Sequence, residues 1–295
     1  MIASRQAIVT MVGLTASLFL LAHAAPARAQ SLDGTLKKVK DSGALTLGYR
    51  ESSPPFSFVG ADKRPIGYSI DLCLQVAAAI EKRLGISNLK LNWVPVTPEG
   101  RIQAVAQGTV DIECGSTTAS LSRQEQVDFS LQTFVDGGSL LTMASTSLRG
   151  VADLGGKKIA VAPGTTTEKS LAEFLKAEFI NAQIVPVKDH AEGLAALEGG
   201  KVEAYASDRG ILIGLALTAG GDPKRFSIGN MAFSYEPYGL MLRRNDAAFR
   251  LTVNRALAEL YRSGKVGPLY GKWFGAFGEP SLALQAMYKL NGLPE

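Results

Sequence analysis

Short apolar runs alternate along the chain with segments whose apolar positions repeat at helical spacing. Residues 44–49 form an apolar run, and residues 69–84 carry their apolar side chains on one helical face. Two more runs, at 89–96 and 110–114, flank a short helical pattern at 101–107. Strands that alternate with helices predict a βαβ unit and a mostly parallel sheet.

A second unit of the same kind follows. Its strands and helices are expected, in turn, at residues 158–161, 164–177, 183–187, 192–197 and 202–206. An extended apolar segment and helical patterns then complete the chain, and they resemble neither unit.

Two stretches, 102–116 and 194–208, match each other at an offset of 92 residues. Each contains a helical pattern, a Gly-x-Val-acid turn, a strand and a final polar residue, which is Ser116 in one and Asp208 in the other. The match predicts two similar lobes. Open α/β sheets bind ligands at the C-terminal ends of their strands, so both polar residues lie at candidate ligand-binding edges.

The order of these units predicts a first lobe that is interrupted by a second. We expect residues 30–135 and 237–295 to form lobe 1 and residues 136–236 to form lobe 2. The chain then crosses between the lobes near 135–142 and again near 235–240. Two linking strands beside a cleft form a hinge, which allows closure on a ligand.

The first 29 residues have the pattern of a secretory signal peptide. Arg5 supplies a positive charge, residues 7–21 form an apolar core, and residues 27–29 form a small-x-small cleavage site. The mature protein is expected to begin near Gln30, with earlier alanines as alternative cleavage points. No later run reaches the roughly 18 apolar residues of a membrane span. We therefore expect a periplasmic protein without stable membrane insertion.

The charge of the mature chain is close to neutral. The full sequence has 31 basic and 27 acidic residues, and the signal segment contains two of the basic ones, Arg5 and Arg28. The mature balance is therefore 29 minus 27, or +2. No Lys/Arg cluster stands out, so nucleic acid is not an expected partner.

Two cysteines, Cys73 and Cys114, leave two interpretations open. An oxidising compartment allows a disulfide. However, Cys73 lies on the apolar face of a predicted helix and Cys114 in a predicted strand, and free cysteine behaves as a small hydrophobe. The favoured interpretation is two buried thiols. Neither cysteine has metal-ligand spacing, and the mature chain has a single histidine, His190, so no metal or other cofactor is expected.

The most informative candidate site follows the strand at 110–114. Ser116 and Thr118 supply hydroxyls at its end, and Arg123 follows five residues later. Hydroxyls, unpaired backbone N–H groups and a guanidinium together suit a small carboxylate. The alternative is a polar turn with a solvated arginine.

Two more arginines follow predicted strands of the first unit. Arg50 comes directly after residues 44–49, which places it at the same sheet edge as Ser116. Arg101 begins the helix after residues 89–96. The alternatives are a solvated loop arginine for Arg50 and a turn cap for Arg101, which is the favoured interpretation of Arg101 taken alone.

The second unit offers three candidates. Thr165 lies in a threonine run that is expected to cap a helix, and a helix N-terminus is also an anion site. Asp208 follows an apolar strand, where it either caps the next helix or pairs with a ligand ammonium. His190 follows another strand, and a structural role is the favoured interpretation for a lone histidine.

The charges of these candidates suggest a ligand. Three arginines and a histidine would leave an empty site with excess positive charge, and buried charges must be paired. One α-carboxylate uses one arginine, and a second carboxylate uses the others. Asp208 then takes an ammonium, so a dicarboxylic amino acid pairs the whole set.

Several segments together carry a family resemblance: 48–53, 67–71, 113–118, 129–130, 164–166, 188–190 and 238–243. The chain resembles the family 3 bacterial extracellular solute-binding proteins, the amino-acid receptors of ABC importers, and especially their glutamate/aspartate-binding branch. This implies a type II periplasmic-binding-protein fold, with two α/β lobes, a two-strand hinge and a ligand cleft between them. It also implies a monomer that delivers its amino acid to a membrane permease without covalent chemistry.

The resemblance further implies a role for each candidate residue. These roles are the α-carboxylate site (Arg123, Ser116, Thr118 and Thr165), the ammonium site (Asp208) and the side-chain site (Arg50, Arg101 and His190). One departure affects the last. The branch usually reads Thr-Ser-x-Asn-Arg where this chain has Thr97-Pro98-Glu99-Gly100-Arg101. Glutamate or aspartate is the expected ligand, and glutamine or asparagine is the alternative.

Two other functions compete with this one. Secreted cyclohexadienyl dehydratases share the fold, and Glu99 or Glu113 is the candidate general acid. No second acid pairs with either in the sequence, which favours a binding protein over an enzyme. A sensor domain is the other alternative, and the chain shows no membrane anchor after the signal segment.

Overall fold

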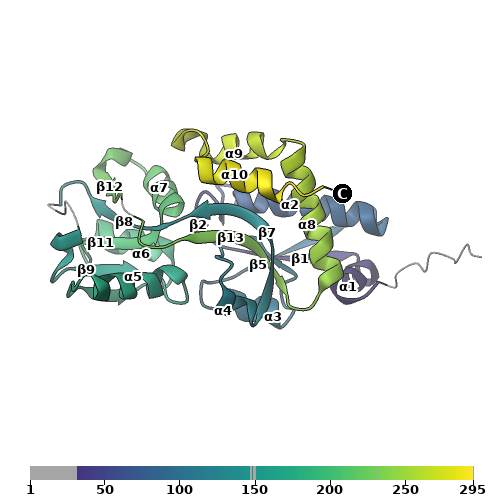
Figure 1. Cartoon of the computed structure of the whole chain (residues 1–295), viewed down its shortest axis with the longest axis horizontal. Helices are drawn as coiled ribbons and strands as arrows, with labels where there is room; N and C mark the ends of the chain where they lie inside the picture. The colour runs from purple at the N-terminus through teal and green to yellow at the C-terminus, as the bar shows by residue number, and fades with distance from the viewer. Residues whose placement is uncertain (1–31, 147, 149–150, 231, 295) are drawn as a thin grey trace, which may run out of the picture. The chain divides into compact units, whose positions relative to one another are not determined.

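The computed structural model describes residues 32–146, 148, 151–230 and 232–294 (Figure 1). The predicted signal peptide, its cleavage site and Gln30 lie outside these residues. Residues Asp33–Glu295 form one compact unit. Within the described part of the chain, no helix has the length and apolar character needed to cross a bilayer.

The first of two five-stranded sheets has the strand order β5-β1-β6-β13-β7. Its strands are Lys90–Pro95 (β5), Ala44–Tyr49 (β1), Ile112–Glu113 (β6), Glu236–Arg243 (β13) and Val127–Asp136 (β7). β5, β1 and β6 are parallel, whereas β13 runs antiparallel to both of its neighbours. The sheet is therefore mixed.

The second sheet repeats this arrangement with the order β10-β9-β11-β8-β12. Its strands are Gln183–Pro186 (β10), Lys158–Val161 (β9), Ala204–Asp208 (β11), Gly138–Met143 (β8) and Phe226–Ile228 (β12). Three strands are again parallel, and β8 is antiparallel to both β11 and β12. β6 and β11, the strands of the internal sequence match, both take third place in their sheets.

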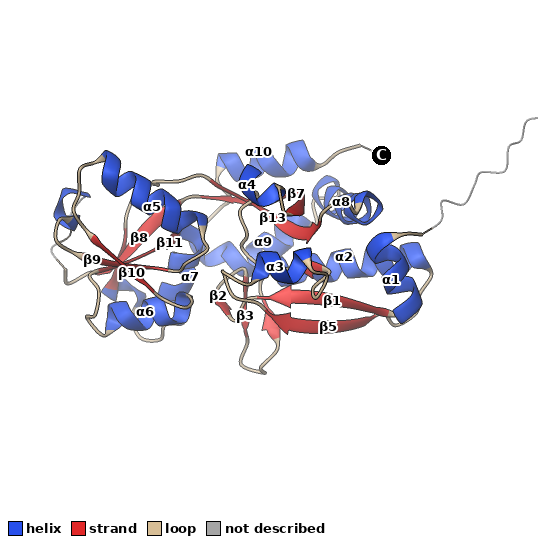
Figure 2. Cartoon of the chain, turned by 90° about the horizontal axis from the view of Figure 1, so that it is seen from below, coloured by secondary structure: helices blue, strands red, loops and turns tan. Residues whose placement is uncertain are grey.

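Helices cover both sheets, as Figure 2 shows. They are Gly34–Ser42 (α1), Tyr68–Leu84 (α2), Arg101–Ala106 (α3), Leu121–Gln124 (α4), Thr166–Ala177 (α5), His190–Glu198 (α6), Arg209–Thr218 (α7), Ala247–Arg262 (α8), Val266–Phe274 (α9) and Leu282–Asn291 (α10). Three short 3-10 turns are Val151–Leu154 (η1), Pro223–Arg225 (η2) and Gly275–Phe277 (η3). A small third sheet joins Ser52–Ser53 (β2), Ser57–Val59 (β3) and Pro65–Ile66 (β4).

The chain crosses between the two large sheets twice. β7 ends at Asp136 in the first sheet and β8 begins at Gly138 in the second. The return runs from β12 to β13, and β13 begins at Glu236, opposite Asp136. Both crossings thus start or end at a carboxylate, and the two carboxylates share one rung of the β7–β13 ladder.

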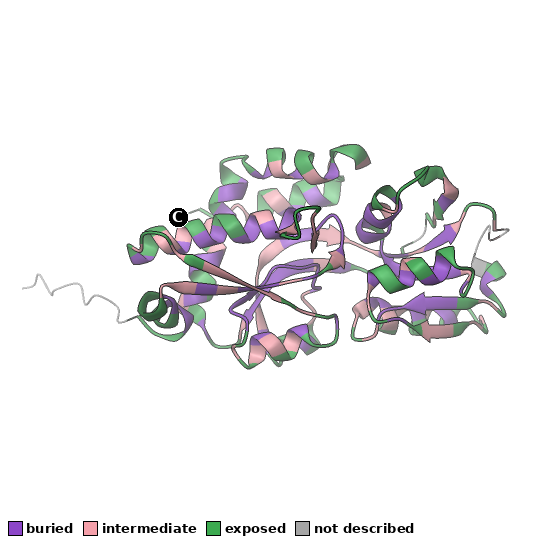
Figure 3. Ribbon diagram, turned by 180° about the vertical axis from the view of Figure 1, so that it is seen from behind, coloured by how far each residue is buried: buried purple, intermediate pink, exposed green. Residues whose placement is uncertain are grey.

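Buried aromatic rings pack on these crossing strands. Phe134 of β7 stacks on Phe274 of α9 with the ring centroids 4.8 Å apart, and Phe56 lies edge-on to Phe134 and Tyr238 at 4.9 and 5.1 Å. Such pairs stabilise a core beyond their buried area. Figure 3 shows the buried residues concentrated along the strands and the inner helix faces. The apolar core therefore fixes the strands that carry the chain between the sheets.

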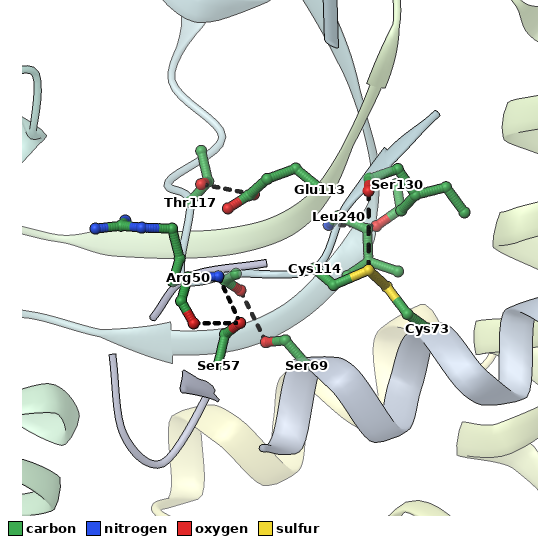
Figure 4. Close-up of a disulfide and its surroundings, with 11 residues drawn as sticks. Arg50, Ser57, Ser69, Cys73, Glu113, Cys114, Thr117, Ser130 and Leu240 are labelled. Atoms are coloured by element: carbon green, nitrogen blue, oxygen red, sulfur yellow. Dashed lines mark hydrogen bonds between the residues drawn. A yellow bond between two sulfur atoms is a disulfide. The ribbon is translucent and has the colours of Figure 1, made fainter. Parts of the chain in front are cut away.

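The prediction of two free thiols is wrong: Cys73 and Cys114 form a disulfide (Figure 4). Cys73 of α2 lies beside Cys114, which directly follows β6, and their Cα atoms are 6.1 Å apart, inside the range that a disulfide spans. The burial of both cysteines suggested two separate apolar side chains, and the same burial places the two sulfur atoms together. Ser69 of α2 also donates a hydrogen bond of 2.8 Å to the Gly115 carbonyl. Both links anchor the segment that leads to Ser116.

Removing the disulfide is expected to lower the free energy of unfolding by about 4 kcal/mol, because the bond closes a loop of 41 residues in the unfolded chain. The measurement is urea unfolding of the Cys73→Ala/Cys114→Ala variant against the oxidised wild type, with reduced wild type as the matched control. Equal unfolding midpoints in all three samples would contradict this expectation.

Candidate functional site

Seven of the eight predicted site residues line one small cavity. They come from loops at the ends of strands in both large sheets, and the cavity wall also contains three residues that the sequence reasoning did not select. The predicted residues are Arg50, Arg101, Ser116, Thr118, Thr165, His190 and Asp208, and the others are Thr166, Ser207 and Ile211.

Arg50 and Arg101 are both buried at 2% exposure. Among the residues that the structure describes, neither guanidinium donates to a protein acceptor, and Arg101 Nε is fully buried without a partner. Burial, followed by the positive charge of Arg101, lowers the pKa of Arg50 to about 10, so Arg50 remains charged at neutral pH. Two adjacent buried cations of this kind favour an anionic ligand group.

Arg123 lies beside the cavity and links the two sheets. Its guanidinium donates to the Thr118 carbonyl at 2.9 Å and to the Gly164 carbonyl, which follows β9, at 3.0 Å. Burial, followed by the charge of Arg101, lowers the pKa of Arg123 to about 10. The solvated-arginine interpretation is therefore wrong, because Arg123 is only 7% exposed and is hydrogen-bonded.

Thr165 caps α5 as predicted. Its hydroxyl accepts from the Glu168 backbone N–H at 3.1 Å and donates to the Ala162 carbonyl at 2.7 Å. The hydroxyl proton is thus already used, so any contribution of this turn to anion binding must come from backbone N–H groups at the helix N-terminus.

Asp208 occupies the N-cap position of α7, but its side chain does not cap the helix. It accepts hydrogen bonds from Thr167 Oγ1, at 2.8 Å, and from the Tyr238 hydroxyl. Burial, followed by the charge of Glu236, raises the pKa of Asp208 to about 6. Of the two sequence interpretations, capping is thus wrong, and the carboxylate lies in the cavity wall, held in place by two hydroxyls.

His190 is the first residue of α6, and its Nδ1 lies 2.5 Å from the Tyr205 hydroxyl. Burial, followed by the charges of Arg50 and Arg101, lowers the pKa of His190 well below its usual value. The ring is therefore neutral at physiological pH. The charge count from the sequence, which included His190 as a cation, was wrong on this point.

The charge count from the sequence also left out two buried carboxylates. Glu113 and Glu236 are both 0% exposed. Glu113 accepts from Thr117 Oγ1 at 2.8 Å, as Figure 4 shows, and its Oε1 has no partner among the described residues. Glu113 is the first residue of segment 113–118, and Glu236 begins the second crossing strand, β13. No spacing in the sequence identifies either as buried beside the arginines, because the contacts are tertiary.

Pro98 and Glu99, where the sequence differs from the usual pattern of the glutamate/aspartate-binding branch, are not part of the cavity wall. Glu99 is exposed, so its charge is screened by water. The backbone here packs on Gly164, where a Cβ would lie 3.1 Å from the Glu99 Cα and 3.3 Å from the Pro98 carbonyl. Gly164 also has φ +74°, so a glycine is required there on both grounds.

Metal chemistry has no support in the described residues. They contain no group of three or more His, Cys, Asp or Glu side chains that could hold a metal ion. The polar groups of the cavity wall are two guanidiniums, several hydroxyls, one imidazole and one carboxylate, and such groups bind a small zwitterion or anion.

The chain matches the model of the bacterial extracellular solute-binding proteins, family 3, over residues 45–276. It is similar to an L-glutamate/L-aspartate-binding protein of Pseudomonas aeruginosa, with 41% identity over 251 residues, 85% of this chain and 83% of the relative. It is also similar to a glutamate/aspartate import solute-binding protein of Salmonella typhimurium, with 35% identity over 264 residues, 90% of this chain and 86% of the relative.

The fold of this chain is also similar to that of a solved amino acid-binding protein. The ancestral amino acid-binding protein AncCDT-1, described as a precursor of cyclohexadienyl dehydratase, matches with a TM-score of 0.71 and 29% identity, over 82% of this chain and 100% of that chain. The predicted fold class, a type II periplasmic-binding-protein fold of two α/β lobes, is confirmed. The family model covers most of the chain, and this protein therefore belongs to the bacterial extracellular solute-binding proteins, family 3.

Proposed function

We propose that this protein binds glutamate or aspartate in the periplasm and delivers it, as a monomer, to the permease of an ABC importer. The observation that carries the proposal is the pair of buried guanidiniums, Arg50 and Arg101, which lack protein acceptors among the described residues and share a cavity with Asp208. The names of the Pseudomonas aeruginosa and Salmonella typhimurium relatives support the same ligands.

We assign the α-carboxylate to Arg123, assisted by backbone N–H groups near Ser116, Thr118 and Thr165. The α-ammonium pairs with Asp208. Arg50 and Arg101 bind the side-chain carboxylate, and His190 contributes as a neutral donor. When its Nδ1 accepts from Tyr205, the ring proton is on Nε2 and is available to a ligand oxygen.

The lobes in this proposal are residues 30–135 with 237–295, and residues 136–236. Arg123 and Gly164 already join the two sheets directly. Arg50 and Arg101 follow strands of the first sheet, and Asp208 ends a strand of the second sheet. A ligand that pairs with all three stabilises the closed arrangement of the lobes, because only the closed arrangement allows both sets of contacts.

An enzymatic function has no supporting observation in the cavity. Of the two candidate general acids, Glu99 is exposed and Glu113 is fully buried and hydrogen-bonded to Thr117. Incubation with prephenate or arogenate is expected to give no aromatic product.

Glutamate and aspartate are expected to raise the melting temperature of the protein. A ligand at about 100 times its Kd adds about 2.7 kcal/mol to stability, because it binds only the folded state. Thermal unfolding with and without each of the twenty amino acids, followed by calorimetry on those that act, tests the proposal. No shift with any amino acid at millimolar concentration would reject it.

Replacing Arg50 by alanine is expected to weaken glutamate and aspartate binding at least tenfold, because a charge-assisted hydrogen bond contributes about 1.5–3 kcal/mol. Any glutamine binding should change much less, since its amide carries no charge for Arg50 to pair. Calorimetry with both ligands makes the comparison. An equal loss for glutamine and glutamate would show that Arg50 does not read the side-chain carboxylate.

A further inference from the structure

We propose that Glu236 is a positioning residue that makes the Thr118 and Thr166 hydroxyls into hydrogen-bond acceptors for the ligand ammonium. The inference rests on the proposed function, because it concerns how the same cavity recognises an amino group. It assigns a role to a carboxylate that does not itself line the ligand cavity.

Three hydroxyls donate to the Glu236 carboxylate. Thr118 Oγ1 and Thr166 Oγ1 both donate to Oε2, the latter at 2.6 Å, and Ser234 Oγ donates to Oε1 at 2.6 Å. The side chain is 0% exposed, and its hydrogen bonds come from hydroxyls, while the charge of Arg123 interacts with it at longer range. A buried carboxylate oxygen needs hydrogen-bond donors, and at Oε2 these donors are the two threonine hydroxyls.

The number of hydroxyl protons determines whether the two threonines can donate hydrogen bonds to a ligand or only accept them. A hydroxyl has one proton to donate and two lone pairs to accept with, whereas a carboxylate only accepts. Because both threonine protons point to Oε2, the 3.2 Å approach between the two threonine oxygens needs no proton of its own. Each oxygen is left with lone pairs only, so it can accept from a ligand and cannot donate to one.

Both threonines line the ligand cavity together with Asp208. Three acceptors in one wall match an ammonium, which has three donors and no acceptor. These two threonines therefore disfavour a carboxylate at this position, because neither of their hydroxyl protons is available to it. The hydroxyl of Thr118 thus serves the ammonium, and only its backbone N–H remains for the α-carboxylate.

Glu236 also accepts hydrogen bonds from residues of both lobes. Thr118 follows β6 of the first sheet, Thr166 begins α5 beside the second, and Glu236 begins the crossing strand β13. The acceptor set is complete only when both threonines reach the same oxygen. Ammonium recognition is consequently tied to the closed arrangement of the lobes.

The test compares glutamate with glutarate, which has both carboxylates and lacks the ammonium, by calorimetry at pH 7.5. Glu236→Met keeps the length of the side chain and removes the acceptor, so both hydroxyl protons are released. We expect glutamate affinity to fall at least tenfold and glutarate affinity to change less than threefold. Glu236→Gln keeps an acceptor oxygen without the charge, and it should retain most of the wild-type preference for glutamate.

Three matched variants complete the design. Thr166→Val removes one acceptor and is expected to lower the preference for glutamate even if Glu236→Met does not fold. Ser234→Ala removes the donor to Oε1, which is outside the cavity, and should leave the preference unchanged. Circular dichroism and thermal unfolding of each ligand-free variant separate a loss of fold from a loss of recognition.

The outcomes separate this inference from the proposed function. Equal losses for glutamate and glutarate in Glu236→Met would overturn it, and so would Glu236→Gln behaving like Glu236→Met, which would indicate a charge effect alone. A wild type that binds no amino acid would overturn the proposed function as well. If the wild type prefers another amino acid, the same comparison uses that ligand and its analogue without the amino group.

Discussion

Replacing Arg123 by alanine is expected to weaken the binding of every amino acid ligand by at least about thirtyfold. Truncating one partner of a buried, hydrogen-bonded charge pair costs about 2–5 kcal/mol. The α-carboxylate is common to all amino acids, so the loss should be similar for glutamate, aspartate and glutamine. Calorimetry with the three ligands measures it.

Arg123→Lys is the matched control for this prediction. Lysine keeps the charge but lacks the planar fork that reaches both the Thr118 and Gly164 carbonyls, so an intermediate affinity is expected. The ligand-free melting temperature shows how much of the change comes from the lost contact between the sheets. Wild-type affinity in Arg123→Ala would place the α-carboxylate elsewhere.

Replacing Asp208 by asparagine is expected to lower glutamate affinity at pH 7.5 by a comparable factor. Asparagine is nearly isosteric, so it can still accept from Thr167 or Tyr238, but it cannot pair with the ammonium charge. Asp41→Asn, at an exposed position, is the control for the change of one carboxylate to an amide. A variant that binds glutamate as tightly as wild type would remove Asp208 from the ammonium site.

The pH dependence of binding provides a second measurement on Asp208. The pKa of Asp208 is raised to about 6 in the ligand-free cavity, and the ammonium pairs only with the ionised carboxylate. Below about pH 6 the proton must leave before the ligand binds, so wild-type affinity should fall as the pH decreases through this range. Asp208→Asn should lose this dependence. An unchanged pH profile in the variant would assign the titration to another group.

Much of the fold was predictable because the apolar periodicity is strong where an element packs on one face. The strand at 158–161 and the helix at 69–84 agree with β9 and α2 to within a residue. α7 entered the sequence analysis only as a helix for Asp208 to cap, without bounds, since its sequence is apolar on most sides and contains Gly210 and Gly214. Gly214 lies so close to the Pro54 carbonyl that a Cβ would be 2.3 Å away, a requirement that local propensity does not reveal.

The candidate site was predictable because its residues follow strands directly. In a parallel sheet the strand ends meet at one edge, so Arg50 and Ser116 had to lie close together. The burial of Glu113 and of Glu236 was not predicted, because it does not follow from a position at the end of a strand. A glutamate within or at the start of a strand has no pattern that distinguishes a buried carboxylate from an exposed one, and its burial depends on which hydroxyls other segments bring to it.

The sequence alone determined the alternation of strands and helices, the two similar units, and which polar residues lie at strand ends, because these properties depend on neighbours along the chain. Tertiary structure decided the disulfide, the neutral state of His190 and the contacts of Asp208. Each of these depends on distances between residues far apart in sequence, such as the 6.1 Å between the Cys73 and Cys114 Cα atoms, and on burial that changes the free energy of a charge.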